Sequence, residues 1–104
     1  MTDPPIACTL DPAEMPQRGD EIRALGRDGL LSVERAERHV TLRFRPDAAI
    51  RRRVESIAAA ESRCCAFLDF SIAREKDATV LTIAAPEGAE PTMHDLADLF
   101  AGTR

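Results

Sequence analysis

The stretch 39–45 constrains the fold most, because its side chains alternate strictly between apolar and polar. The apolar members are Val40, Leu42 and Phe44, and the polar members that alternate with them are Thr41, Arg43 and Arg45. Successive side chains of a strand point to opposite faces, so this stretch covers a core with one face and meets water with the other. That pattern is typical of an antiparallel sheet, and we expect a hairpin with the strand 30–34 through the charged turn 35–38.

Helical and extended patterns alternate along the rest of the chain. We expect further strands at 5–10, 67–72 and 79–85, and helices at about 16–25, at 46–64 and from Pro91 onward. Asp11-Pro12-Ala13-Glu14 has the form of a capping box, while Gly26 and Gly102 suit helix ends. The long helix carries an inner stripe made of Ile50, Val54, Ile57 and Ala58.

The order of these elements predicts a single α+β domain over residues 1–104, since 104 residues are enough for one domain. We expect an antiparallel sheet of about five strands with helices on one face. The first six elements have the βαββαβ order of a ferredoxin-like sheet, and the last two would add a strand and a covering helix. A different antiparallel order of the same strands remains open.

Composition and charge narrow the function. A net charge of -4 argues against direct binding of nucleic acid, and the run Arg51-Arg52-Arg53 is interpreted as a solvated helix face. The sequence has no apolar run long enough to span a membrane and no signal peptide at its start, which predicts a cytoplasmic protein. Three cysteines are an odd number, which favours reduced thiols over a disulfide framework.

The group of residues with most chemical potential is Glu61, Cys64 and Cys65, with Cys8 elsewhere in the chain. Glu61 lies four residues before Cys65, so a helix would point both the same way. A ferredoxin-like order would bring the end of strand 5–10, and with it Cys8, to the start of strand 67–72. Three thiolates suit Hg(II), Cu(I) or Zn(II), with Glu61 or water as fourth ligand. The alternative is that the cysteines pack as small apolar side chains.

Other candidates are weaker. His39 and His94 lack metal-ligand spacing and are expected at the surface, and Asp69 is expected to face solvent or the helix layer. The sequence contains no glycine-rich phosphate loop and no G-x-S-x-G nucleophile motif. Whether the chain is an enzyme stays open at this point.

The segment Ala7-Cys8-Thr9-Leu10, together with Glu61-x-x-Cys64-Cys65-x-Phe67-x-x-Phe70, resembles a group of small bacterial proteins. They share an "ACTL" start and an "ExxCCxFxxF" centre, and some are fused behind regulators of the mercury-resistance type. The resemblance implies that Cys8, Cys64 and Cys65 bind a thiophilic metal or act in redox chemistry. It also implies association with a transcriptional regulator.

The leading hypothesis is thiol-based sensing or sequestration of a soft heavy metal such as Hg(II), with Cys8, Cys64, Cys65 and Glu61 as ligands. Two alternatives come from other classes: a homodimerising interaction module with structural cysteines, and a small cysteine-dependent enzyme. Metal binding predicts accessible thiols that converge on one point. The interaction module predicts thiols that are buried and apart, and the enzyme predicts a pocket beside them.

Overall fold

Four strands form one antiparallel sheet in the computed structural model, which describes residues 15–102 except for the side chains of 15–17. The order across the sheet is β1-β2-β4-β3. The strands are β1 (Leu30–Arg35), β2 (His39–Phe44), β3 (Asp69–Arg74) and β4 (Thr79–Ala84). Two hairpins, β1-β2 and β3-β4, are joined through the pair β2-β4, in which Leu42 lies opposite Leu81.

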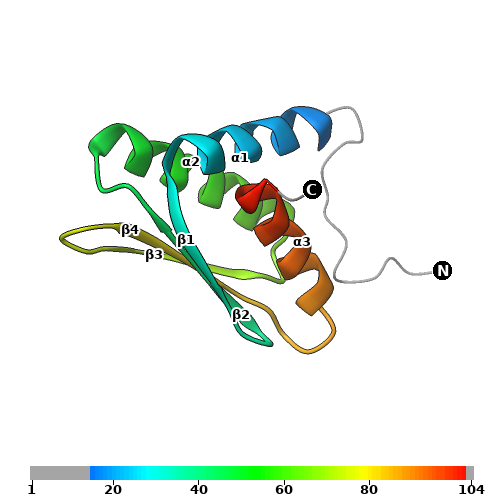
Figure 1. The fold of residues 1–104 in the computed structure, drawn as a ribbon. Helices are drawn as coiled ribbons and strands as arrows, with labels where there is room; N and C mark the ends of the chain where they lie inside the picture. Colours follow the sequence, from blue (N-terminus) through cyan, green and yellow to red (C-terminus); the bar gives the residue numbers. More distant parts are fainter. Residues whose placement is uncertain (1–14, 103–104) are drawn as a thin grey trace.

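Three helices cover one face of this sheet (Figure 1): α1 (Met15–Gly29), α2 (Ala48–Cys64) and α3 (Glu90–Ala101). The predicted alternation in β2 is confirmed, because Val40, Leu42 and Phe44 are fully buried while Thr41 and Arg43 are partly exposed. The helices and this sheet face enclose one hydrophobic core. Phe44 meets Phe100 of α3 edge to face there, with ring centroids 5.7 Å apart.

The α+β class, the antiparallel sheet and the three helices agree with the sequence prediction, but the strand count does not. Residues 15–102 contain four strands, and the predicted strand 5–10 and capping box 11–14 lie outside the described residues. The ferredoxin-like order is not confirmed. It requires strand 5–10 between β2 and β3, whereas β4 pairs with both of them. Strand β4 is mostly buried, as expected of a central strand, whereas the prediction had made it an added strand.

Gly26 was predicted to end the first helix, and this prediction is wrong. Helix α1 continues to Gly29, and Gly26 is buried where α1 crosses α3. A Cβ at this position would lie 1.8 Å from the carbonyl oxygen of Phe100. The glycine therefore permits close approach of two helix backbones, a role that a local stop signal does not reveal.

The ends of the other helices follow ordinary capping chemistry. Helix α2 begins two residues later than predicted, because Asp47 caps it by accepting a hydrogen bond from the Ile50 amide at 3.3 Å. Gly102 ends α3 with a positive φ of 76°, as predicted.

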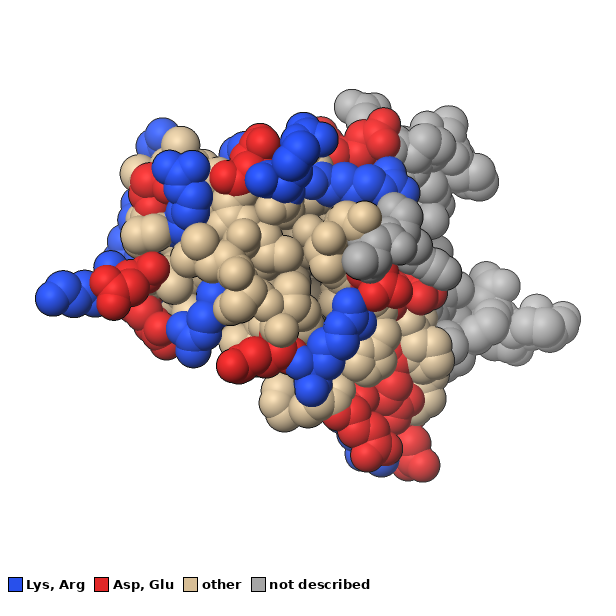
Figure 2. Space-filling model, in the orientation of Figure 1, with Lys and Arg blue, Asp and Glu red and all other residues tan. Residues whose placement is uncertain are grey.

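Acidic and basic side chains are interspersed on the surface (Figure 2). Several pairs connect different elements; Arg53 of α2, for example, lies 3.0 Å from Asp28 of α1. Leu31, at the bulge in β1, is the exposed large apolar side chain of the described residues. No helix within 15–102 is both long and apolar enough to cross a membrane.

Candidate metal centre

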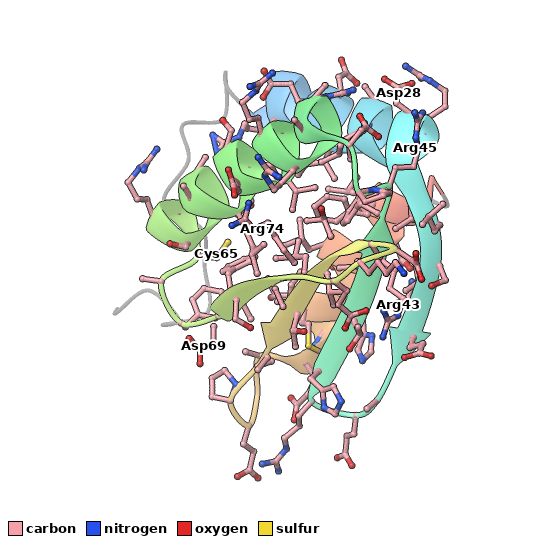
Figure 3. All side chains as sticks on the ribbon, turned by 90° about the vertical axis from the view of Figure 1, so that its left-hand side faces the viewer. Asp28, Arg43, Arg45, Cys65, Asp69 and Arg74 are labelled. Carbon is pink, nitrogen blue, oxygen red and sulfur yellow. The ribbon has the colours of Figure 1, made fainter. Side chains whose placement is uncertain are left out.

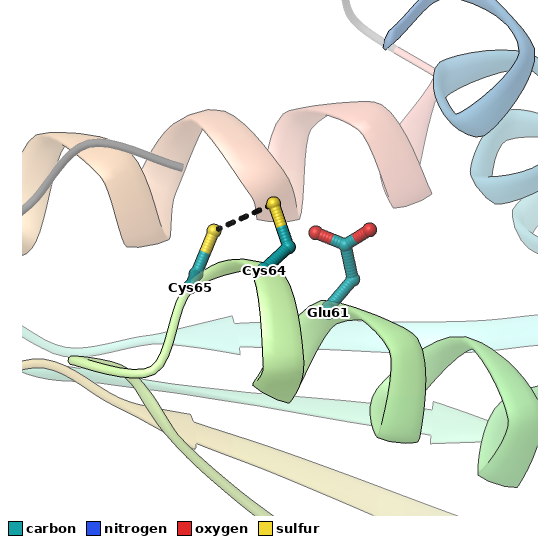
Figure 4. A group of neighbouring side chains, drawn as sticks. All are labelled: Glu61, Cys64 and Cys65. Atoms are coloured by element: carbon teal, nitrogen blue, oxygen red, sulfur yellow. Dashed lines mark hydrogen bonds between the residues drawn. The ribbon is translucent and has the colours of Figure 1, made fainter. Parts of the chain in front are cut away.

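The last turn of α2 places Glu61, Cys64 and Cys65 on the side of the helix that faces the core. The buried stripe of this helix runs through Ile50, Val54, Ala58, Glu61 and Cys64. Helix hydrogen bonding extends one residue further, because the Cys65 amide donates to the Glu61 carbonyl at 2.6 Å. The spacing of three and four residues therefore brings the three side chains together as predicted (Figure 4).

The ligand atoms of these residues converge. One oxygen of Glu61 and the two sulfurs all lie within 4.8 Å of one another, and the Sγ atoms of Cys64 and Cys65 are 3.9 Å apart. The residues are 5%, 6% and 2% exposed, respectively. The sulfurs are thus convergent but buried, a combination that neither the metal hypothesis nor the interaction module predicted in full.

Arg18 completes the group from the neighbouring helix. Its guanidinium Nη2 lies 3.3 Å from Oε2 of Glu61, and the two side chains are 23% and 7% exposed. Burial raises the pKa of the Glu61 carboxyl, and the positive charge of Arg18 opposes that shift. Within the described residues the same nitrogen makes no hydrogen bond, so its contact with Glu61 is an ion pair alone.

Sequence reasoning missed Arg18. Arg18 precedes Glu61 by 43 positions in the sequence and lies in a charged helix. Only the packing of α1 against α2 brings the two side chains together. The available signal was Glu61 itself, because a carboxylate on an apolar stripe requires a partner. That argument predicts a cation without saying which one.

Cys65 is disulfide-bonded in the structure, which differs from the prediction of reduced thiols. A sulfur in a disulfide is not a thiolate and does not bind metal ions as one. The form of this centre that can bind a metal through both sulfurs is therefore the reduced form.

Among the described residues, His39, His94 and Asp69 do not join this group. Cys8 lies outside the described residues. His39 is exposed. His94 lies 3.2 Å from the guanidinium of Arg35, which belongs to β1, and β1 is the edge strand opposite β3. Asp69, at the start of β3, points into solvent, whereas Cys65 is buried at the end of α2 (Figure 3).

An open depression of about 390 Å³ lies just beyond Cys65 in the chain. Its lining residues are Ala66, Phe67, Leu68, Asp69, Ala84, Ala85 and Pro86. Neither thiol lines it, so this depression does not provide the substrate pocket that the enzyme hypothesis predicted beside the cysteines.

No family model, no curated protein and no solved structure is significantly similar to this chain.

Proposed function

We propose that this chain binds a thiophilic metal ion such as Hg(II) through its cysteines, in a sensing or sequestering role. The observation that carries the proposal is the convergence of two sulfurs and a carboxylate oxygen within 4.8 Å at one buried point. Soft thiolate ligands select soft and borderline metal ions, and a thiolate pair supplies the strongest part of such a site. Cys8 is a third candidate ligand from the sequence.

The buried carboxylate beside the sulfurs supports binding over mere packing. A core that needed only small apolar side chains would not retain a carboxylate beside the thiols, because an ionised carboxylate in the interior is costly. Glu61 and Arg18 form an ion pair at the position where a bound cation and its thiolates would also lie. Binding should release protons, since thiols ionise when they become ligands.

The test is calorimetric titration of Hg(II) into reduced protein under anaerobic conditions. We expect Cys64→Ser with Cys65→Ser to abolish tight binding, and Ser62→Ala, an exposed position in the same helical turn, to leave it unchanged. Cys8→Ser shows separately whether a third sulfur contributes.

The oxidised protein is a second arm of the same experiment. Because Cys65 offers no thiolate while it is disulfide-bonded, the oxidised protein should bind Hg(II) more weakly than the reduced protein. If the double serine variant binds Hg(II) as tightly as the parent, the cysteines are not the ligands and the proposal is wrong.

A further inference from the structure

The distance between the two sulfurs carries information about the ion. Two sulfurs that each bind a zinc-like ion at about 2.3 Å lie about 3.8 Å apart at a tetrahedral angle, and about 4.6 Å apart when sulfur, metal and sulfur are collinear. The Sγ atoms of Cys64 and Cys65 are 3.9 Å apart. Cys65 is disulfide-bonded at this spacing, so reduction must precede binding. In the reduced protein a bent arrangement is the one closest to the observed spacing, whereas a collinear one requires the sulfurs to separate.

Glu61 lies where a third ligand would be needed. In Figure 4 one carboxylate oxygen is directed toward the sulfur of Cys64 and the other away from it. The oxygen bound by Arg18 at 3.3 Å is Oε2, which leaves the second oxygen for another partner. Carboxylate oxygen is a regular ligand of zinc, whereas the softest ions prefer sulfur alone.

Charge balance selects the valence of the ion. Two thiolates and the Glu61 carboxylate carry three negative charges, and Arg18 supplies one positive charge. A divalent cation brings the buried group to neutrality, while a monovalent cation such as Cu(I) leaves one negative charge uncompensated. Uncompensated charge at a site where the side chains are nine-tenths buried is strongly unfavourable.

We infer that the centre takes a divalent ion of the zinc class in a bent site, with Cys64, Cys65 and Glu61 as direct ligands and Arg18 as the balancing charge. This inference rests on the proposed function and deepens it by naming the class of ion. Arg18 acts on the site through Glu61, whose carboxylate it orients. The fourth position of a tetrahedral ion is left for a water molecule or for the thiol of Cys8.

The inference is tested with Zn(II), Co(II) and Hg(II) on reduced protein, comparing Glu61→Gln with Glu55→Gln. Glu55 is an exposed glutamate of the same helix and serves as the matched control. We expect Glu61→Gln to weaken Zn(II) binding by about tenfold or more, the loss typical of disturbing a metal's surroundings. Binding of Hg(II), which is satisfied by the two sulfurs, should change little, and Glu55→Gln should match the parent throughout.

Co(II) gives a readout besides affinity. In the parent it should show the intense visible absorption of a tetrahedral thiolate site, and Glu61→Gln should shift and weaken that absorption. Glu61→Asp keeps the negative charge but shortens the side chain, so the same loss of Zn(II) affinity is expected even if the glutamine variant folds poorly. Circular dichroism verifies the fold of each variant.

The outcomes separate the two proposals. If Glu61→Gln and Glu61→Asp both bind Zn(II) as the parent does, Glu61 is not a ligand and the inference is overturned while the proposed function stands. If the parent binds Hg(II) but neither Zn(II) nor Co(II), the inference is again overturned. If the reduced parent binds none of the three ions, the proposed function itself fails.

Discussion

Two of the arginine–glutamate pairs among the described residues lie on opposite faces of the sheet. Arg18 and Glu61 lie 3.3 Å apart between α1 and α2, and both side chains are mostly buried. Arg43 of β2 and Glu75, just after β3, are closer at 2.6 Å, but 37% and 50% of these side chains are exposed. The shorter pair contributes less to stability, because water competes for exposed charges and weakens their attraction.

The buried pair is consequential because each charge depends on the other. Taking either charge out of water is unfavourable, and the partner compensates only while it is present. For the Glu61 carboxyl, burial outweighs the attraction of Arg18, since its pKa is raised overall. Matched substitutions at buried and exposed positions can therefore test how strongly burial determines each residue's effect on stability.

The largest expected effect is steric and concerns two glycines of α1. Gly26→Ala should destabilise the fold by about 3 kcal/mol, because the new Cβ meets the Phe100 carbonyl oxygen and forces α1 and α3 apart. Gly19→Ala is the matched change at an open position, where the new Cβ lies 3.4 Å from the mobile end of Arg23. It should stabilise the helix by up to about 1 kcal/mol through helix propensity. Urea unfolding of both variants measures the difference, and equal effects would contradict the close approach of α1 and α3.

Gly26 also shows what the sequence can and cannot predict. Local patterns predicted both hairpins, the α3 glycine stop and the burial of alternate residues in β2, because these features depend on neighbours in the chain. Gly26 and Arg18 depend on which helices touch, and β4 took the central place that had been assigned to another strand. The last turn of α2 belongs to the first group, so the convergence of Glu61 with Cys64 and Cys65 was predictable from spacing.

The second-largest expected change in stability comes from removing the glutamate of each ion pair. In reduced, metal-free protein, Glu61→Ala should cost about 2 kcal/mol of unfolding free energy, because it leaves Arg18 partly buried without its partner. Combining Arg18→Met with Glu61→Leu should recover most of this loss, since packed apolar side chains replace a buried pair at little cost. Glu75→Ala, the exposed counterpart, should be indistinguishable from the parent. A loss for Glu75→Ala as large as that for Glu61→Ala would mean that burial does not separate the two pairs.

The smallest effect is a pH dependence of opposite sign at two glutamates. Burial raises the pKa of Glu61 above its ordinary value of 4.5. Hydrogen bonds from the backbone amides of Glu90 and Gly88 lower the pKa of Glu90. The Gly88 amide donates to Glu90 Oε1 at 2.8 Å. A raised carboxyl pKa contributes stability that is present below the unfolded value and is lost as pH rises through the folded value. A lowered one contributes stability that is present above the unfolded value and is lost as pH falls through the folded value.

Glutamine at either position removes the titration, so the two variants should diverge from the parent in opposite directions. As pH rises past 4.5 toward neutrality, Glu61→Gln should gain stability relative to the parent, because the parent must ionise a buried carboxyl. As pH falls below 4.5, the stability of Glu90→Gln should approach that of the parent, because the parent loses its hydrogen-bonded carboxylate. Urea unfolding of metal-free protein across this range measures both differences. If the Glu61→Gln difference instead falls with rising pH, as expected for Glu90→Gln, then Arg18 outweighs burial at Glu61, and the buried pair would be a source of stability in its own right.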